Sequence, residues 1–123
     1  MAVVKYTVIV GPNGTVPAGV MVATWANLAT GDTGTPLMAS GYPDKTGTMA
    51  GTIGTSTALF EGSPDGTLWQ TIKDVRGTAL SYTTLPKQAV VEENTRFIRP
   101  SVTGGAGATV TFTATCSSPG VQG

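Results

Sequence analysis

The sequence predicts an all-β protein: a single-domain antiparallel β-sandwich, for which a jelly roll is the arrangement we expect. Short apolar runs alternate with polar residues and are cut by Gly and Pro, and no window has the 3.6-residue period of a helix. About eight such runs follow one another at the spacing of sandwich strands. The 123 residues contain no low-complexity linker and no internal repeat, so residues 1–123 are expected to form one domain.

The first half of the chain predicts strands of unequal clarity. The first strand places four alternating residues on one face, namely Val4, Tyr6, Val8 and Val10. Residues 20–28, "VMVATWANL", predict a second strand whose apolar residues do not alternate cleanly. Between residues 37 and 53, "LMAS" and "TMAGTI" predict weaker strands, interrupted by "GYPDKTG". The glycines of this region indicate bends or close approach of the backbone to a neighbour.

Residues 57–62 and 67–72 predict a hairpin. Between them, Ser63-Pro64-Asp65-Gly66 fits a type I turn, with Pro at the second position and Gly at the fourth.

The hairpin register then predicts where its aromatic residues lie. Pairing of Gly62 with Thr67 places Phe60 directly opposite Trp69, so both rings are expected to be buried and in contact. For Trp25 the irregular pattern of its strand leaves core and surface equally open.

The second half of the chain continues with short strands near Tyr82, in "AVVEEN" and in "RFIRPSV". Residues 108–116, "ATVTFTATC", form the clearest strand, with Thr residues on one face. The other face carries Val110, Phe112, Ala114 and Cys116. Cys116 is therefore expected to be a buried small hydrophobe rather than a reactive thiol. The Gly-rich "TGGAG" before this strand reads as a hairpin loop, because it has no Lys and opens no helix as a phosphate-binding loop does.

Charge and composition exclude several classes of function. Seven basic and seven acidic residues are scattered along the chain, so no basic stripe suggests nucleic acid. No segment approaches the roughly 18 apolar residues of a membrane helix, and no signal peptide is recognisable. A soluble protein made in a cytoplasm is expected. Only 11% of the residues are charged, which suits a surface packed against neighbours.

Candidate chemical groups are few. The chain has no His, the usual general base, and its one Cys cannot form an internal disulfide. Asp44, Asp65 and Asp74 fall in predicted turns, where Asp bonds its own backbone; a calcium site that gathers two of them is the alternative.

The spacing of the other charged residues does not indicate a catalytic site either. Glu92 and Glu93 are adjacent, so they point to opposite faces of a strand. Arg96 and Arg99 alternate across their strand, and one of them is expected to pair with Glu92 or Glu93. We therefore expect no enzymatic activity, no cofactor and no catalytic or metal-binding residue.

Two motifs in the second half of the chain resemble a known family. Gly62, Ser63, Asp65, Gly66 and Trp69 match G-S-x-D-G-x-x-W, and residues 96–100, "RFIRP", match R-[YF]-[IL]-R-P before a Gly-rich turn. This layout resembles the small all-β decoration (cement) proteins of tailed bacteriophage capsids. It covers about half the chain and leaves residues 1–57 with compatible strands only.

The resemblance implies a virion structural protein on the outer surface of an icosahedral phage head, assembled in the host cytoplasm. It implies the major capsid protein as partner and a homotrimer, with no nucleic acid or membrane bound. Residues 1–3 and 117–123 are expected to contact neighbouring chains, because ordering a Gly- and Ser-rich segment costs about 1–2 kcal/mol per residue.

Two alternatives stay open. The S-x-D-G-x-x-W hairpin also resembles discoidin-like carbohydrate-binding sandwiches, so the chain could be a carbohydrate-binding module, free or in a phage fibre. A phage neck or tail structural protein is the third reading.

Overall fold

The computed structural model describes residues 2–11, 19–39, 42, 44–91 and 95–117, which form strands, turns and loops without a helix. In these ranges no helix is therefore long and apolar enough to cross a membrane. The strands are β1 (Val3–Val4), β2 (Tyr6–Val10), β3 (Val20–Ala29), β4 (Thr33–Gly34), β5 (Leu37–Met38), β6 (Asp44–Thr52), β7 (Thr57–Ser63), β8 (Gln70–Thr71), β9 (Ser81–Tyr82), β10 (Lys87–Val91), β11 (Phe97–Thr103) and β12 (Thr109–Ser117).

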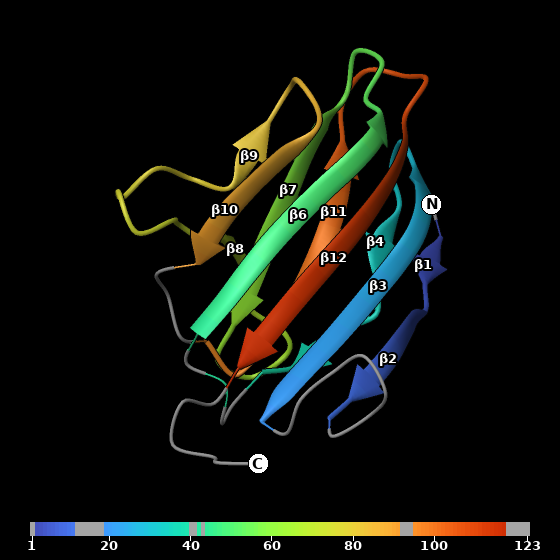
Figure 1. Cartoon of the computed structure of the whole chain (residues 1–123). Coiled ribbons are helices and arrows are strands. Elements are labelled where there is room, and N and C mark those ends of the chain that lie inside the picture. The colour runs from blue at the N-terminus through green and yellow to red at the C-terminus, as the bar shows by residue number, and fades with distance from the viewer. Residues whose placement is uncertain (1, 12–18, 40–41, 43, 92–94, 118–123) are drawn as a thin grey trace.

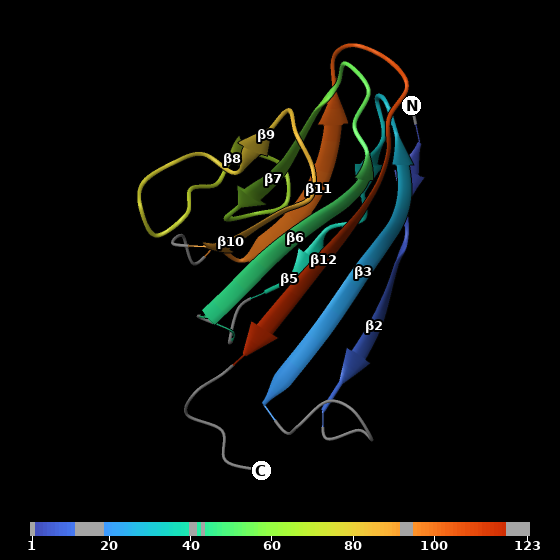
Figure 2. The ribbon, with the colours of Figure 1, turned by 45° about the horizontal axis from the view of Figure 1, so that its top comes forward.

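The strands form two sheets that pack face to face (Figure 1). The seven-stranded sheet runs in the order β1-β4-β11-β7-β8, with β5 also paired to β11 and β9 to β7. The five-stranded sheet runs in the order β10-β6-β12-β3-β2. Figure 2 shows the same two layers after rotation, with β6, β12 and β3 in front of β7 and β11. The predicted all-β sandwich is confirmed.

The order of pairing is that of a jelly roll. Since β4 and β5 share the partner β11, and β8 and β9 share β7, each of these couples counts as one strand. The strands then form four antiparallel pairs: β3 with β12, β4/β5 with β11, β6 with β10, and β7 with β8/β9. Strands from the start of the chain thus pair with strands from its end. This nested pairing arises when one long antiparallel ribbon folds into two sheets.

Three aromatic rings join the two sheets in the core. Phe60 on β7 meets Trp25 on β3 at a ring-centroid distance of 6.4 Å and Phe112 on β12 at 5.4 Å, both edge to face. Gly47 on β6 makes room for this cluster, because a Cβ there would lie 2.8 Å from the Phe60 ring. The close approach predicted for the glycines of this region is thus confirmed at Gly47.

The irregular pattern of β3 has a local cause. Burial first alternates at Met21, Ala23 and Trp25. The next buried residue is Leu28, so the two-residue alternation is broken after Trp25. Asn27, which lies between Trp25 and Leu28, has a φ of 59°. The pairing with β12 shifts at the same level, between Val110 and Phe112. A bulge with one residue in the left-handed conformation therefore turns Leu28 back to the core.

The buried face of β12 agrees with the prediction: Val110, Phe112, Ala114 and Cys116 are all buried. The loop before it does not. "TGGAG" joins β11 in the seven-stranded sheet to β12 in the five-stranded sheet, so it is a connection between sheets and not a hairpin loop. Gly105 has a φ of 60°, and a side chain there would overlap the Thr55 carbonyl.

The single N-terminal strand predicted from the sequence is also wrong. β1 pairs with β4 in the seven-stranded sheet, where Val3 stands opposite Thr33 of the same chain. After Lys5 the chain crosses to the five-stranded sheet, where β2 pairs with β3. Alternation along a strand is the same whichever sheet the strand joins, so the crossing leaves no mark in the pattern. Met1 and residues 118–123, for which neighbour contacts were predicted, lie outside the described residues.

The predicted interruption by "GYPDKTG" is too long, because its last four residues already belong to β6, which runs from Asp44 to Thr52. Asp44 is the first residue of this strand and not a turn residue. Lys45 follows it and is buried, with its Nζ donating to the Tyr42 carbonyl at 2.9 Å. Burial lowers the pKa of Lys45 from its ordinary value.

Candidate interaction surfaces

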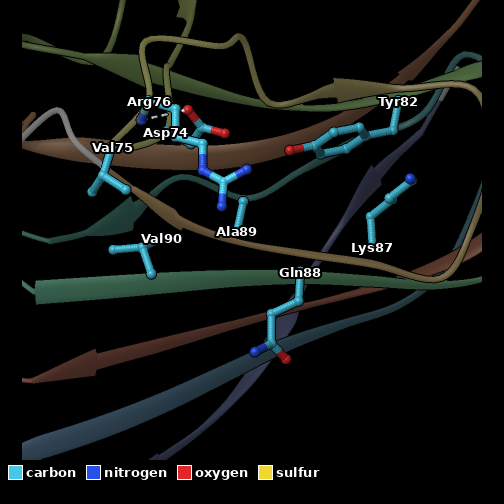
Figure 3. Close-up of a pocket in the computed structure, with 8 residues that line it drawn as sticks. All are labelled: Asp74, Val75, Arg76, Tyr82, Lys87, Gln88, Ala89 and Val90. Atoms are coloured by element: carbon cyan, nitrogen blue, oxygen red, sulfur yellow. Dashed lines mark hydrogen bonds between the residues drawn. The ribbon is translucent and has the colours of Figure 1, made fainter.

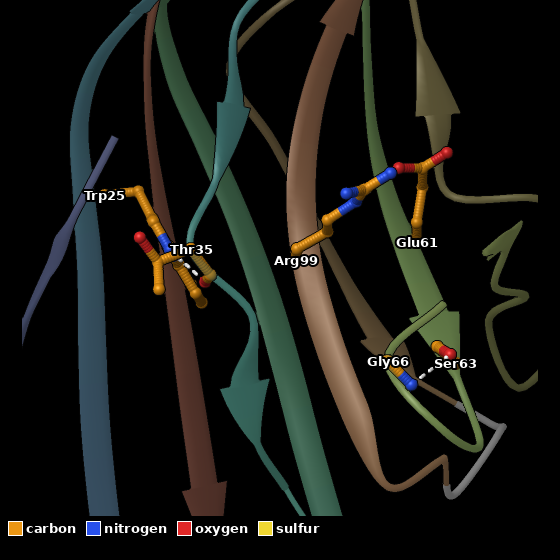
Figure 4. Close-up of polar contacts among 6 residues, drawn as sticks. All are labelled: Trp25, Thr35, Glu61, Ser63, Gly66 and Arg99. Atoms are coloured by element: carbon orange, nitrogen blue, oxygen red, sulfur yellow. Dashed lines mark hydrogen bonds and ion pairs between the residues drawn. The ribbon is translucent and has the colours of Figure 1, made fainter. Parts of the chain in front are cut away.

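Side chains close the turn that follows β7. The amide of Gly66 donates to the Ser63 hydroxyl at 2.8 Å (Figure 4). The amides of Leu68 and Thr67 donate to Oδ1 of Asp65 at 3.0 and 2.9 Å, and these bonds hold the pKa of Asp65 below its ordinary value. Gly66 has a φ of 87°, which Gly adopts without strain. The turn lies where the sequence predicts it, and the side-chain oxygens of Ser63 and Asp65 hold it.

The predicted hairpin register is wrong by three residues. Gly62 pairs with Gln70 and not with Thr67, because the bonds to Asp65 keep the two residues after Gly66 in the turn. Phe60 is buried, but Trp69 is only half-buried and has no place in the Phe60 cluster. The prediction of a buried Phe60–Trp69 pair is therefore wrong.

Trp25, which the sequence left open, is the core tryptophan. Its side chain is fully buried, and Nε1 donates to the Thr35 carbonyl at 3.0 Å (Figure 4). Its ring also meets Tyr6 of β2 edge to face, at a centroid distance of 5.7 Å. A buried indole whose one donor is paired is typical of a core position.

Trp69 instead supports Arg99 on the outer side of the seven-stranded sheet. The guanidinium of Arg99 lies 4.2 Å from the centre of the Trp69 ring. Its Nε donates to Oε1 of Glu61 at 2.9 Å, across the β7–β11 pairing (Figure 4). The Arg99 and Glu61 side chains are 24% and 19% exposed, so the ion pair is partly shielded from water. We refer to Glu61, Trp69 and Arg99 as the arginine stack.

The predicted pairing of Arg96 or Arg99 with Glu92 or Glu93 stays a prediction. Arg99 pairs with Glu61, and Glu92 and Glu93 lie outside the described residues. The guanidinium of Arg96 lies 5.3 Å from the centre of the Phe97 ring. Glu61 was missed because its partner is distant in sequence, and only the β7–β11 register brings the two together.

The two motifs behind the family resemblance form one structural unit. β7 and β11 pair side by side, with Ser63 opposite Phe97 and Glu61 opposite Arg99. A Cβ at Gly66 would stand 3.6 Å from the Phe97 ring, so that ring lies against the turn. The motif residues therefore hold a turn onto a neighbouring strand.

The three aspartates with predicted roles occupy separate elements. Asp44 begins β6, Asp65 holds the turn after β7, and Asp74 accepts the amides of Arg76 and Thr78, each at 2.9 Å. Turn placement is thus confirmed for Asp65 and Asp74. Within the described ranges no three His, Cys, Asp or Glu side chains come close enough to hold a metal ion.

Cys116 is fully buried beside β6, as the sequence predicts. Burial raises the pKa of its thiol to about 11, against the opposing effect of the Lys45 charge. A thiol with this pKa carries almost no thiolate at neutral pH, and thiolate is the reactive form.

The last residues of β2 are apolar, and they extend the inner face of the five-stranded sheet beyond the part that the seven-stranded sheet covers. β2 is the last strand of the five-stranded sheet. Val8 and Val10 stand opposite the buried Ala23 and Met21, so all four side chains share the inner face. Yet Val8 and Val10 are 43% and 53% exposed, and Ile9 on the outer face is 44% exposed. We call Val8, Ile9 and Val10 the β2 overhang; Figure 1 shows β2 reaching below β1 at one side of the molecule.

The other sheet edges are short or partly covered, whereas β2 is neither. β1, β8 and β9 have two residues each, and short edges offer little to another strand. β10 begins with Lys87, and the Val75 amide bonds its Val90 carbonyl at 3.1 Å. β2 has five residues, with no charge and no Pro among them. An edge of this kind is suited to contact with another chain.

A cleft of about 420 Å³ lies between β10 and the segment that leads from β8 to β9 (Figure 3). Its lining includes the polar side chains of Arg76, Lys87, Asp74, Tyr82 and Gln88. The Lys87 ammonium stands 5.8 Å from the centre of the Tyr82 ring. Burial raises the pKa of Tyr82, and the Asp74 carboxylate adds to this shift.

No family model matches this chain, and no curated protein sequence matches it.

Proposed function

We propose that this chain is a capsid decoration (cement) protein, which binds the outer surface of a tailed-phage head and stabilises it. The observation that carries the proposal is the β2 overhang: a sheet edge whose inner side chains extend the core but stay exposed. Such a surface is costly for a chain that works alone in water and useful for one that works bound to others. A weakly charged chain, with 11% charged residues, suits the same role.

The mechanism would be mechanical. A protomer that covers its overhang against the major capsid protein, or against a second protomer, would bury about 800 Å² of surface per partner. Pressure from packaged DNA would then have to break these contacts as well as those of the shell. The homotrimer and the place on the outside of the head come from the family resemblance and belong to the proposal.

The resemblance and the overhang support the proposal from different parts of the chain. The matching motifs lie between Gly62 and Pro100, where they build the turn and the arginine stack. The overhang lies within residues 1–57, the part that the resemblance does not cover. The motifs would thus identify the scaffold, and the β2 overhang would make the contact.

The test is reconstitution on purified phage heads that lack the protein. Wild-type chain should bind them and raise the temperature at which they release DNA, or their resistance to a chelator. The double variant Val8→Lys/Val10→Lys places two charges on the overhang and should fold but bind at least tenfold more weakly. Leu68→Lys is the matched control, because Leu68 is 62% exposed in the turn after β7. Equal binding by all three proteins, or no protection of the heads, would contradict the proposal.

A carbohydrate-binding module is the second candidate, and the half-buried Trp69 favours it. The Trp69 ring carries Arg99 over one face, and its remaining surface could stack on a sugar ring. A glycan array separates the two functions. Binding of neutral sugars that Trp69→Ala abolishes and Val8→Lys/Val10→Lys leaves intact would favour this candidate.

A further inference from the structure

The cleft beside β10 carries more positive than negative charge. Arg76 and Lys87 supply two cations and Asp74 supplies one carboxylate (Figure 3). Oδ1 of Asp74 accepts the amides of Arg76 and Thr78, so this carboxylate already holds the turn. The Arg99–Glu61 ion pair lies elsewhere, between β7 and β11. Arg76 and Lys87 are both exposed, so their charges are accessible to an anionic group of a ligand.

The cleft also borders the backbone of an edge strand. β10 is the last strand on its side of the five-stranded sheet. The Val90 carbonyl accepts the Val75 amide, so the backbone of Val90 faces away from β6. Because this direction alternates along a strand, the amide and carbonyl of Gln88 face the same outward side, beside the cleft. An extended peptide backbone is the partner that fits such groups.

We propose that this cleft binds an extended segment of a partner protein that carries an Asp or Glu side chain. The segment pairs its backbone with β10 at Gln88, and its carboxylate lies between Arg76 and Lys87. A guanidinium suits this role because its donors match both oxygens of a carboxylate. An acidic sugar fits less well, because Lys87 stands over the Tyr82 ring on which a sugar would stack. The proposal goes beyond the decoration function, since it concerns a different surface and holds whether or not the partner is a capsid.

The test uses the full chain and an array of capped seven-residue peptides with alternating Thr and Val, in which the central residue is varied. Peptides with a central Asp or Glu should bind best, and a central Gln should weaken binding about tenfold, the effect of losing a charge-assisted hydrogen bond. Arg76→Gln and Lys87→Gln should each reduce binding of the Glu peptide to a similar degree. In nuclear magnetic resonance titrations, the largest shifts should map to Gln88 and its neighbours.

Arg96→Gln is the matched control, because it removes the same charge from an exposed residue that does not line the cleft. It should bind the Glu peptide as the wild type does. Three results would overturn the proposal: no peptide binds, Glu and Gln peptides bind equally, or Arg76→Gln binds like wild type. Stronger binding of glucuronate than of the Glu peptide, lost in Arg76→Gln, would also overturn it and assign the cleft to acidic sugars.

Discussion

The two tryptophans differ in what surrounds them, and this difference has a measurable consequence. Trp25 fills the space between the sheets, so Trp25→Ala should lower the free energy of unfolding by about 3–5 kcal/mol, as large core deletions do. Trp69 is half-buried and contacts Arg99, so Trp69→Ala should cost only about 1 kcal/mol. Urea unfolding of both variants measures the two losses. Equal losses would mean that Trp69 also belongs to the core.

Cys116 provides a second prediction for a single residue. Its thiol is buried and the pKa of the thiol is raised to about 11. The folded protein should therefore not react with a thiol reagent near pH 8, whereas the chain unfolded in concentrated guanidinium should react at once. Between the ordinary thiol pKa and about 11, the folded state keeps a proton that the unfolded chain loses. The free energy of unfolding should therefore fall as pH rises through this window. Cys116→Ala should lack this part of the fall, and rapid labelling of the folded protein would contradict the burial.

Among the elements, the turn after β7 depends on one carboxylate. Asp65 accepts the amides of Leu68 and Thr67, which lowers its pKa in the folded state. Its contribution to stability should therefore be present above its ordinary pKa of about 3.9 and disappear as pH falls through the lower folded value. In thermal unfolding at neutral pH, the wild type should have a higher melting temperature than Asp65→Asn. In acid the two melting temperatures should converge. A difference that stays constant with pH would show that the amide bonds do not depend on the charge.

The bulge in β3 makes a prediction about backbone conformation. Asn27 has a φ of 59°, which Asn and Gly tolerate and β-branched residues do not. Asn27→Gly should change stability by a few tenths of a kcal/mol, whereas Asn27→Val should cost about 1–2 kcal/mol. Chemical denaturation of the two variants tests this. If Asn27→Val is as stable as wild type, β3 pairs with β12 without the bulge.

For the whole molecule, the β2 overhang predicts association. Covering Val8 and Val10 removes apolar side chains from water, so we expect the wild-type chain to associate, and the proposed function implies a trimer. Val8→Lys/Val10→Lys should sediment as a monomer with an unchanged circular dichroism spectrum, and Leu68→Lys should remain a trimer. A wild-type monomer at high concentration would leave capsid binding as the sole role of the overhang.

Properties that depend on local pattern could be predicted from the residues alone. Alternation along β12 predicted its buried face and the state of Cys116, and Gly, Pro and Asp placed the turn at residues 63–66. The three-dimensional fold was needed to establish which sheet β1 and β2 join, which tryptophan is buried, and that Arg99 pairs with Glu61. The physical reason is that side-chain direction alternates within any strand, whereas register and sheet membership depend on contacts with strands far away in sequence. The overhang and the cleft beside β10 arise at that second level, where one sheet ends before the other and a turn lies against an edge strand.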